Sequence, residues 1–599
     1  MPGAFAGSAH SSPHQPKFDY IIVGGGLSGL VVANRLSEAK NVTVIVIENG
    51  AIDDRPATSI PYLTNLNTAN YYDITSGPEP FMGNKTWQVH VGNVVGGSSV
   101  VNGMQWDRGA DADYDAWEQL GNLGWGYRGL RKYFKKSTHF HGPSEAIRKH
   151  FNITYDASVY GNGPVKLSIP SYQYEDYASI MKSYVSRGDI PHSREGLSRP
   201  IGTFWTPNSI NNDTKERCHA RKAYYDPVKD RKNLILMPNT HVDEILFSND
   251  TKPAAIGVRI TSNINATTSL VYAKKEVVLA AGGVFTPHLL MLSGVGPKDV
   301  LSDAGIPLKK DLAAVGSNFQ DHQVLNMVFQ LSNQSVPNLD MILTYPDTEF
   351  NATAADLYTE NRTGPWTFSR GNAALFLPFK YFSKKYQNIT TLISKQNATH
   401  YLPERYLNNV ALLKGYLKQR EILISHYLSE DAAVGEWPIQ PWGRSGAAIQ
   451  KPLSRGILML NSTNPAGNPI VVRHAFQNPV DKMVLGEVVR WNRQHWQSPH
   501  LARYAPNETV PGPQYTSDEE IFYGGIKTAS LNPTWAHSSG ACPMMPEKLG
   551  GCVDSDLRVY GVDNLRVVDA SILPLIPAAH LQATMYAVAE KAADIIKRG

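Results

Sequence analysis

The chain has 599 residues, of which 42% are hydrophobic and 18% charged, and its formal net charge is +4 at pH 7. A chain of this length is too long for one compact core, so we expect at least two substructures. The net charge is small and no arginine- and lysine-rich run occurs, which argues against nucleic acid as a partner. No stretch of about 18 apolar residues occurs, so nothing predicts a membrane-spanning segment.

Residues 1–16 are rich in Ser, Pro, Gly and His and lack the apolar region of a signal peptide, so we interpret them as a disordered leader. Thirteen Asn-X-Ser/Thr sequons favour a secreted or secretory-pathway protein with N-glycans, whose signal peptide is absent from this numbering. The sequon asparagines are Asn41, Asn84, Asn152, Asn212, Asn249, Asn265, Asn333, Asn351, Asn361, Asn388, Asn397, Asn461 and Asn507. Asn41, between a predicted helix and a predicted buried strand, is the one least expected to be modified.

Three cysteines, Cys218, Cys542 and Cys552, are too few for a disulfide scaffold and lack zinc-site spacing, so we expect no metal. Cys542 and Cys552 are close enough in sequence to close a short loop. Two interpretations stay open: a single bridge with Cys218 free, or buried thiols.

The first structured segment, residues 18–50, is typical of a βαβ unit. Residues 20–23 form a β-branched run that predicts a buried strand. A glycine turn, an apolar-faced helix over residues 27–37 and a second buried strand over residues 42–48 follow.

Gly24, Gly26 and Gly29 form a G-x-G-x-x-G pattern in this turn. The first glycine allows the tight turn, the second lets the backbone approach a pyrophosphate, and the third lets the helix pack close to the strand. The helix N-terminus then faces the phosphates, and Glu48 at the end of the second strand can accept ribose hydroxyl protons. The unit predicts a dinucleotide but does not choose between FAD and NAD.

Further regular elements lie far along the chain. We expect a strand over residues 276–281, an apolar helix over residues 286–293, a strand over residues 565–573 and an amphipathic helix over residues 583–597. The long stretches between these elements carry many aromatics, prolines and sequons. The nucleotide-binding fold is therefore expected to assemble from discontinuous pieces.

Four separated segments resemble the glucose–methanol–choline (GMC) family of FAD-dependent oxidoreductases. In chain order they are residues 92–102 (followed by Trp106, Gly109 and Asp115), 282–296, 315–322 and 537–590. The second segment departs from the family pattern at Gly283, where a small side chain is usual. The resemblance runs from Phe18 to the C-terminus, and its C-terminal block is most similar to the glucose oxidase and aryl-alcohol oxidase branch.

The resemblance implies an α/β fold: a Rossmann-like FAD-binding domain built from discontinuous segments, and an α+β substrate domain with a large antiparallel sheet. We expect the FAD-binding domain at residues 17–115, 228–330 and 521–599, and the substrate-binding domain at residues 116–227 and 331–520. Some members link FAD covalently through a histidine, where this chain has Val101. FAD is therefore expected to be noncovalent. Beyond the glycine turn and Glu48, the implied FAD contacts are Gly96, Gly97, Ser98, Asn102, Gly103, Val242, Ala281, Asp569, Ala570, His580, Gln582 and Thr584.

Hydride transfer from an alcohol to flavin N5 needs a base for the hydroxyl proton, and histidine suits this work. By resemblance His537 is the general base and His580 its partner, which is Asn in many other members. The alternative is that both are structural histidines satisfied by backbone groups. His322 is expected to have a structural or flavin-adjacent role.

The substrate is expected to be an aryl alcohol or a ring-bearing secondary metabolite. Glucose oxidases place an Arg and an Asn four and two residues before the base, where this chain has Pro533 and Trp535. Sugar hydroxyls would then lack partners, at about 1–3 kcal/mol each. Trp535 offers instead a flat wall on which a ring can stack, unless it points into the core.

The leading hypothesis for the electron acceptor is O2. The alternatives are a dehydrogenase that uses a quinone or another acceptor, a non-redox lyase or cyclase of the same fold, and a passive flavin-binding protein.

Overall fold

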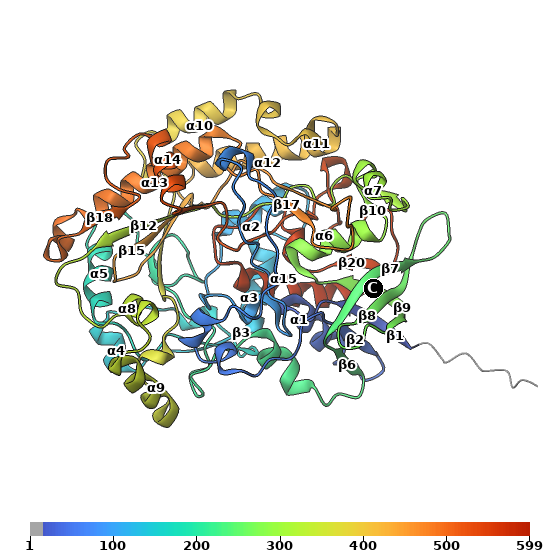
Figure 1. The fold of residues 1–599 in the computed structure, drawn as a ribbon, viewed down its shortest axis with the longest axis horizontal. Helices are drawn as coiled ribbons and strands as arrows, with labels where there is room; N and C mark the ends of the chain where they lie inside the picture. Colours follow the sequence, from blue (N-terminus) through green and yellow to red (C-terminus); the bar gives the residue numbers. More distant parts are fainter. Residues whose placement is uncertain (1–15) are drawn as a thin grey trace, which may run out of the picture.

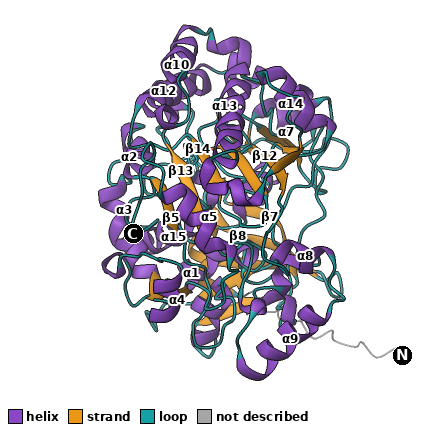
Figure 2. Cartoon of the chain, turned by 90° about the vertical axis from the view of Figure 1, so that its left-hand side faces the viewer, coloured by secondary structure: helices purple, strands orange, loops and turns teal. Residues whose placement is uncertain are grey.

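The computed structural model describes residues 16–599 (Figure 1). Within these residues the chain forms two seven-stranded sheets. The predicted leader, apart from Pro16, lies outside the described residues. Strands of both sheets lie in the interior with helices around them (Figure 2). Within residues 16–599, no helix combines the length and apolar composition needed to cross a bilayer.

The first sheet contains the predicted βαβ unit. Its strands are β6 (Leu234–Met237), β2 (Val44–Ile47), β1 (Lys17–Val23), β9 (Thr268–Leu279), β8 (Ala255–Ser262) and β7 (Thr240–Phe247) in spatial order, with β20 (Leu565–Val567) also paired to β9. The pairs among β6, β2, β1, β9 and β20 are parallel, whereas β7, β8 and β9 form an antiparallel meander. Ile22 pairs with Val46 and Val278, and all three are fully buried, as expected for parallel strands covered on both faces.

Beside this sheet, helix α15 (Leu581–Ile596) packs on both α1 (Leu27–Leu36) and α3 (Tyr127–Ser137). A fourth, α6 (Gly282–Leu292), packs on β7. The parallel strands and α1 therefore form the predicted Rossmann-like unit.

The second sheet is antiparallel. Its order is β18 (Asn507–Val510), β12 (Val324–Gln330), β15 (Arg444–Ile449), β14 (Gly435–Pro438), β13 (Ala373–Leu377) and β5 (Gly202–Trp205), with β19 (Leu531–Asn532) paired to β12. Helix α13 (Pro479–Trp496) packs on β15, β12 and β14, and α14 (Asp518–Lys527) and α10 (Tyr386–Lys395) pack on α13. Helix α12 (Val410–Leu428) lies next to α10 in the same outer layer (Figure 1).

The remaining elements are small two-stranded sheets and further helices outside the two large sheets. Three two-stranded sheets are formed by β3 (Thr138–His141) with β4 (Val165–Ser168), β10 (Val295–Gly296) with β11 (Lys310–Asp311), and β16 (Ile457–Met459) with β17 (Ile470–Val472). The other helices are α2 (Asp111–Gln119), α4 (Glu145–His150), α5 (Asp176–Val185), α7 (Lys298–Asp303), α8 (Leu339–Thr344), α9 (Glu349–Asn361) and α11 (Glu404–Leu407).

The strand predicted over residues 565–573 is wrong in its second half. Strand β20 ends at Val567, and residues Ala570–Ile572 form a 3₁₀ turn. The Asp569 carboxylate accepts a hydrogen bond from the Ser571 backbone N–H at 2.9 Å, which stabilises this turn in place of an extended strand. Helix α6 also begins four residues before the predicted start, at Gly282.

Three elements pair or pack across the predicted domain boundaries. Strands β12 and β19, expected in the FAD-binding domain, belong to the antiparallel sheet. Helix α3, expected in the substrate-binding domain, packs on α15 of the first sheet's helix layer. Composition shifts did not indicate these exchanges, because they depend on pairing between distant segments.

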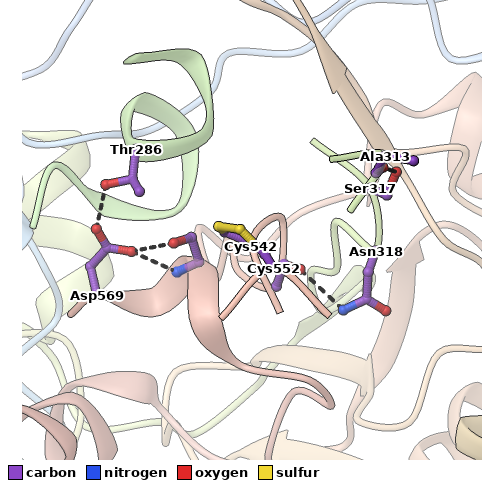
Figure 3. The surroundings of a disulfide bond; sticks show 9 residues. Thr286, Ala313, Ser317, Asn318, Cys542, Cys552 and Asp569 are labelled. Atoms are coloured by element: carbon purple, nitrogen blue, oxygen red, sulfur yellow. Dashed lines mark hydrogen bonds between the residues drawn. A yellow bond between two sulfur atoms is a disulfide. The ribbon is translucent and has the colours of Figure 1, made fainter. Parts of the chain in front are cut away.

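Cys542 and Cys552 form a disulfide, and Cys218 is a buried free thiol, so the first of the two cysteine interpretations is confirmed. Figure 3 shows this disulfide with Asp569 on one side of it and Asn318 on the other. Asn318 Nδ2 donates to the carbonyl of Gly540 at 3.1 Å, next to the cross-linked segment. The disulfide therefore stabilises the chain directly after residues 535–538, which carry the predicted base.

Candidate active site

A cavity of about 620 Å³ lies where the two sheets meet. The first sheet contributes the β1–α1 turn, the ends of β2 and β9, and the start of α6. From the second sheet, Pro438 at the end of β14 lines the cavity, and so does Gln440 just after it. Residues 535–538 also line the cavity.

Most of the predicted site residues line this one cavity. They are Gly24, Gly26, Glu48, Gly97, Ser98, Asn102, Gly103, Val242, Ala281, Trp535, His537, Asp569, Ala570, His580 and Gln582. Three predicted contact residues do not line it. Gly29 lies on the strand-facing side of α1, Gly96 lies behind Gly97, and the Thr584 hydroxyl is hydrogen-bonded to the Tyr114 hydroxyl at 2.8 Å in the core.

The glycine turn has the geometry that its sequence predicts. Gly24 has φ +103°, and a Cβ there would lie 2.5 Å from the carbonyl oxygen of Ala280 on the adjacent strand. A Cβ on Gly29 would lie 1.9 Å from the Gly24 oxygen, so α1 packs against the turn at a distance that only glycine permits. At Gly26 the nearest atom to such a Cβ is 3.7 Å away, so the backbone faces the cavity.

Glu48 lies at the end of β2 with its carboxylate beside the turn. One oxygen accepts from the Gly25 N–H at 2.7 Å and the other from the Gly50 N–H at 2.8 Å. Burial raises the pKa of Glu48 to about 7, although both N–H groups favour the ionised form. Each oxygen keeps a lone pair with which it can accept a further hydrogen bond.

Residues 97–103 cross the cavity wall and are held by an arginine that sequence reasoning missed. Arg217 is fully buried, and its guanidinium donates to the Ser99 carbonyl at 2.9 Å and to the Asn102 side-chain and backbone oxygens at 2.6 Å each. Asn102 in turn donates to the Gln582 side chain at 3.0 Å. These bonds fix the segment against the N-terminal end of α15.

Asp569 forms hydrogen bonds with two segments beside the cavity, the start of α6 and its own following turn. Its Oδ2 accepts from the Gly282 N–H at 3.0 Å and from the Thr286 hydroxyl at 2.5 Å, as Figure 3 shows for Thr286. Its Oδ1 accepts from Ser571. Asp569 therefore fixes the start of α6 beside the cavity.

His537 and His580 lie in the same cavity with ring centroids 5.8 Å apart and planes at 89°. The Trp535 ring lies 6.3 Å from each of them. Trp535 thus faces the cavity and packs behind against Gly446 of β15, where a Cβ would lie 3.3 Å from its ring. Trp535 and His537 come from one segment, and His580 comes from the N-terminal end of α15, 43 positions beyond His537.

Two carboxylates determine the charge of His580. Its Nδ1 lies 2.7 Å from Asp107 Oδ1, and its Nε2 lies 3.7 Å from Glu436 Oε1. Burial lowers the pKa of His580, but the two carboxylates outweigh it and raise the pKa to about 9. Burial raises the pKa of Glu436 to about 8, so we assign the main effect to the hydrogen-bonded Asp107. The raised pKa favours the cationic form of His580 at neutral pH.

His537 is neutral under the same conditions. Burial, and then the charge of His580, lower the pKa of His537 to about 3. Its Nδ1 lies 2.9 Å from Nδ1 of His322, so one ring donates to the other and Nε2 remains the free nitrogen. A charged and a neutral histidine side by side give the site one proton acceptor and one electrostatic partner.

Asp321 holds the segment that carries His537. Its Oδ1 accepts from the backbone N–H groups of His322, Trp535 and His537 at 2.9–3.1 Å. Its Oδ2 accepts from the Thr534 hydroxyl at 2.5 Å. Burial raises the pKa of Asp321, and the charge of nearby Arg473 opposes this shift. Asp321 is a positioning residue that the sequence did not single out, although it precedes His322 in a recognised block.

We expect Asp321→Ala to lower the maximal turnover rate by about a hundredfold, because a shift of about 1 Å in the base costs that much. Asp321→Asn is the matched control, since its amide oxygen can still accept the three backbone bonds; we expect less than a tenfold loss. Steady-state kinetics of both purified variants measures this. Equal losses in the two variants would contradict the positioning role.

The Asp107–His580 pair predicts a pH-dependent stability. Because the pKa of His580 is raised above its ordinary value of about 6.5, its charged form stabilises the fold fully below that pH. This contribution is lost as the pH rises through about 9. We expect Asp107→Asn to cost roughly 2–3 kcal/mol at pH 6 and much less at pH 9.5. Thermal unfolding across this pH range tests it, and an equal cost at both ends would refute it.

The fold and the cavity together are typical of a nucleotide-binding protein whose cavity contains two neighbouring histidines. The chain belongs to the GMC oxidoreductase family: the N-terminal family model matches residues 18–324 and the C-terminal model residues 452–589. This confirms the resemblance inferred from the four sequence segments.

Three similar proteins cover nearly the whole chain. A dehydrogenase, xptC, of Emericella nidulans is 34% identical over 97% of this chain and 93% of its own length. The structure of an FAD-dependent oxidoreductase from Chaetomium thermophilum has a TM-score of 0.92 and 34% identity, covering 97% of this chain and 99% of that one. The structure of a fungal aryl-alcohol oxidase has a TM-score of 0.89 and 33% identity, with the same coverage. These similarities confirm the GMC fold with its two sheets.

Proposed function

We propose that this protein binds FAD noncovalently and oxidises an aryl or other ring-bearing alcohol, with O2 as the electron acceptor. The observation that carries the proposal is the location of His537 and His580 in the cavity that also contains the glycine turn. The dehydrogenase and aryl-alcohol oxidase relatives support the reaction class.

The cavity residues fit FAD. The backbone faces open space at Gly26, where the nearest atom to an added Cβ is 3.7 Å away, and at Gly282, where nothing lies within 4 Å of one. The Glu48 carboxylate is placed for a ribose and the start of α1 for a pyrophosphate. Val101 lines the cavity and has no nucleophilic atom, which supports noncovalent attachment. FAD should then appear in the supernatant after acid precipitation of the protein.

In the proposed reaction, bound FAD supplies the hydride acceptor. Neutral His537 accepts the substrate hydroxyl proton at its free Nε2. An alcohol is a far weaker acid than an imidazolium, so this proton moves only as the C–H bond breaks. Cationic His580, held by Asp107, stabilises the negative charge that develops on the substrate oxygen. Trp535 provides the flat wall for the ring.

An anaerobic screen of aryl, aliphatic and sugar alcohols tests the proposal. We expect aryl alcohols to bleach the FAD absorbance and sugars to leave it unchanged. Product formation without bleaching would favour the non-redox lyase or cyclase alternative. If no alcohol bleaches the FAD and none is converted to product, the proposal is refuted. Stopped-flow mixing of the reduced enzyme with air separates an oxidase, which reoxidises rapidly, from a dehydrogenase, which does not.

We also propose that the protein is a secreted or secretory-pathway glycoprotein. All thirteen sequon asparagines are exposed or partly exposed, Asn41 included, so none is sterically excluded by burial. The Cys542–Cys552 disulfide is compatible with an oxidising compartment. A mass decrease after glycosidase treatment of the protein from its native source would support this, and an unchanged mass would refute the glycan assignment.

A further inference from the structure

Arg370 is a cation in the cavity wall that the proposed reaction does not use. It lies just before β13, is exposed, and lines the cavity together with Tyr71, Gln440 and Trp535. Its Nε donates to the Asn65 side chain at 2.9 Å, and its backbone carbonyl accepts from Gln440 at 3.2 Å. A Cβ on Gly103 would lie 3.6 Å from Arg370 Cδ, so the Arg370 side chain lies beside the end of residues 97–103.

No carboxylate within residues 16–599 forms an ion pair with Arg370. The carboxylates that line the cavity are Glu48 and Asp569, and both are hydrogen-bonded to backbone N–H groups at the nucleotide end. Exposure alone does not explain an unpaired arginine here, because Arg444, with 52% of its side chain exposed, is paired with Asp340. At the substrate end of the cavity His580 is paired with Asp107, whereas Arg370 has no carboxylate partner among residues 16–599.

We propose that the substrate is a ring-bearing alcohol that carries a carboxylate, and that Arg370 binds this carboxylate. The inference rests on the proposed alcohol oxidation. The planar guanidinium matches a carboxylate in two parallel hydrogen bonds, while Trp535 and Tyr71 offer faces for the ring. The alcohol carbon is oxidised to an aldehyde by losing a hydride to FAD and a hydroxyl proton to His537. The carboxylate is unchanged.

Two substrates that differ in charge, and otherwise only by one methyl group, test this inference: 4-(hydroxymethyl)benzoate and its methyl ester. We expect kcat/KM for the acid to exceed that for the ester by about tenfold or more, because a charge-assisted pair is worth that much. In Arg370→Gln the ratio should fall to about one, mainly through loss of rate with the acid. Arg444→Gln, an exposed arginine outside the cavity, should keep the ratio of the unmodified enzyme.

Calorimetric titration of the FAD-loaded protein gives a second measurement without turnover. Benzoate should bind more tightly than benzamide, and Arg370→Gln should abolish the difference. Equal rates for acid and ester, or a ratio that Arg370→Gln leaves unchanged, would overturn the carboxylate inference while leaving alcohol oxidation intact. If no alcohol in the anaerobic screen bleaches the FAD, the proposed function itself fails, and this inference fails with it.

Discussion

Replacing His537 by Ala is expected to slow anaerobic reduction of bound FAD by an aryl alcohol about 10²–10⁴-fold, the usual contribution of a positioned base. The reason is that the two imidazoles beside His537 cannot replace it: His322 is fully buried, and His580 is charged through its bond to Asp107. Stopped-flow absorbance at the flavin band measures the rate directly. The ratio of flavin to protein absorbance should stay unchanged.

The matched control is His426→Ala, which removes another buried histidine whose burial also lowers its pKa, to about 4. It does not line the cavity, so it should keep the reduction rate and lose only stability. Added imidazole should restore part of the rate in His537→Ala, since the variant leaves space where the ring stood. A reduction rate within threefold of the original in His537→Ala would show that His537 is not the base.

Local patterns predicted the nucleotide half of the site because its chemistry is contained in short segments. The β1–α1 turn needs glycine at Gly24 and Gly29 for steric reasons that act within one βαβ unit, and Glu48 follows from the length of that unit. The family blocks added His537 and His580. The role of Trp535 as a wall of the substrate pocket was inferred only because Pro533 and Trp535 replace the Arg and Asn of the glucose oxidase branch.

The residues that hold His580 and residues 97–103 in place escaped prediction because their partners are distant in sequence. Asp107 and His580 are 473 positions apart, and Arg217 and Asn102 are 115 apart. A buried carboxylate or arginine has no periodicity that marks it before its partner is known. The same limit explains the domain boundaries, since β12 and β19 join the antiparallel sheet through pairing that composition does not reveal.

The second large effect concerns the glycine turn: Gly24→Ala is expected to abolish FAD binding. The added Cβ would lie 2.5 Å from the Ala280 carbonyl oxygen and 2.7 Å from its carbon, and both belong to the backbone of the adjacent strand segment, so neither can rotate away. The strand must shift, and the positive φ of +103° adds a backbone cost of about 1–2 kcal/mol. The ratio of flavin to protein absorbance after purification measures the loss.

Gly83→Ala separates these two causes. Gly83 also has a positive φ, of +72°, but a Cβ there would meet nothing within 4 Å. This variant should therefore lose only the backbone cost and keep its full FAD content, whereas Gly24→Ala loses the cofactor. If both variants retained FAD equally, the turn would tolerate a side chain at Gly24, and its close contact with the Ala280 backbone would not be what shapes the nucleotide site. If both lost FAD equally, backbone strain rather than the steric clash would be the cause, because the clash exists only at Gly24.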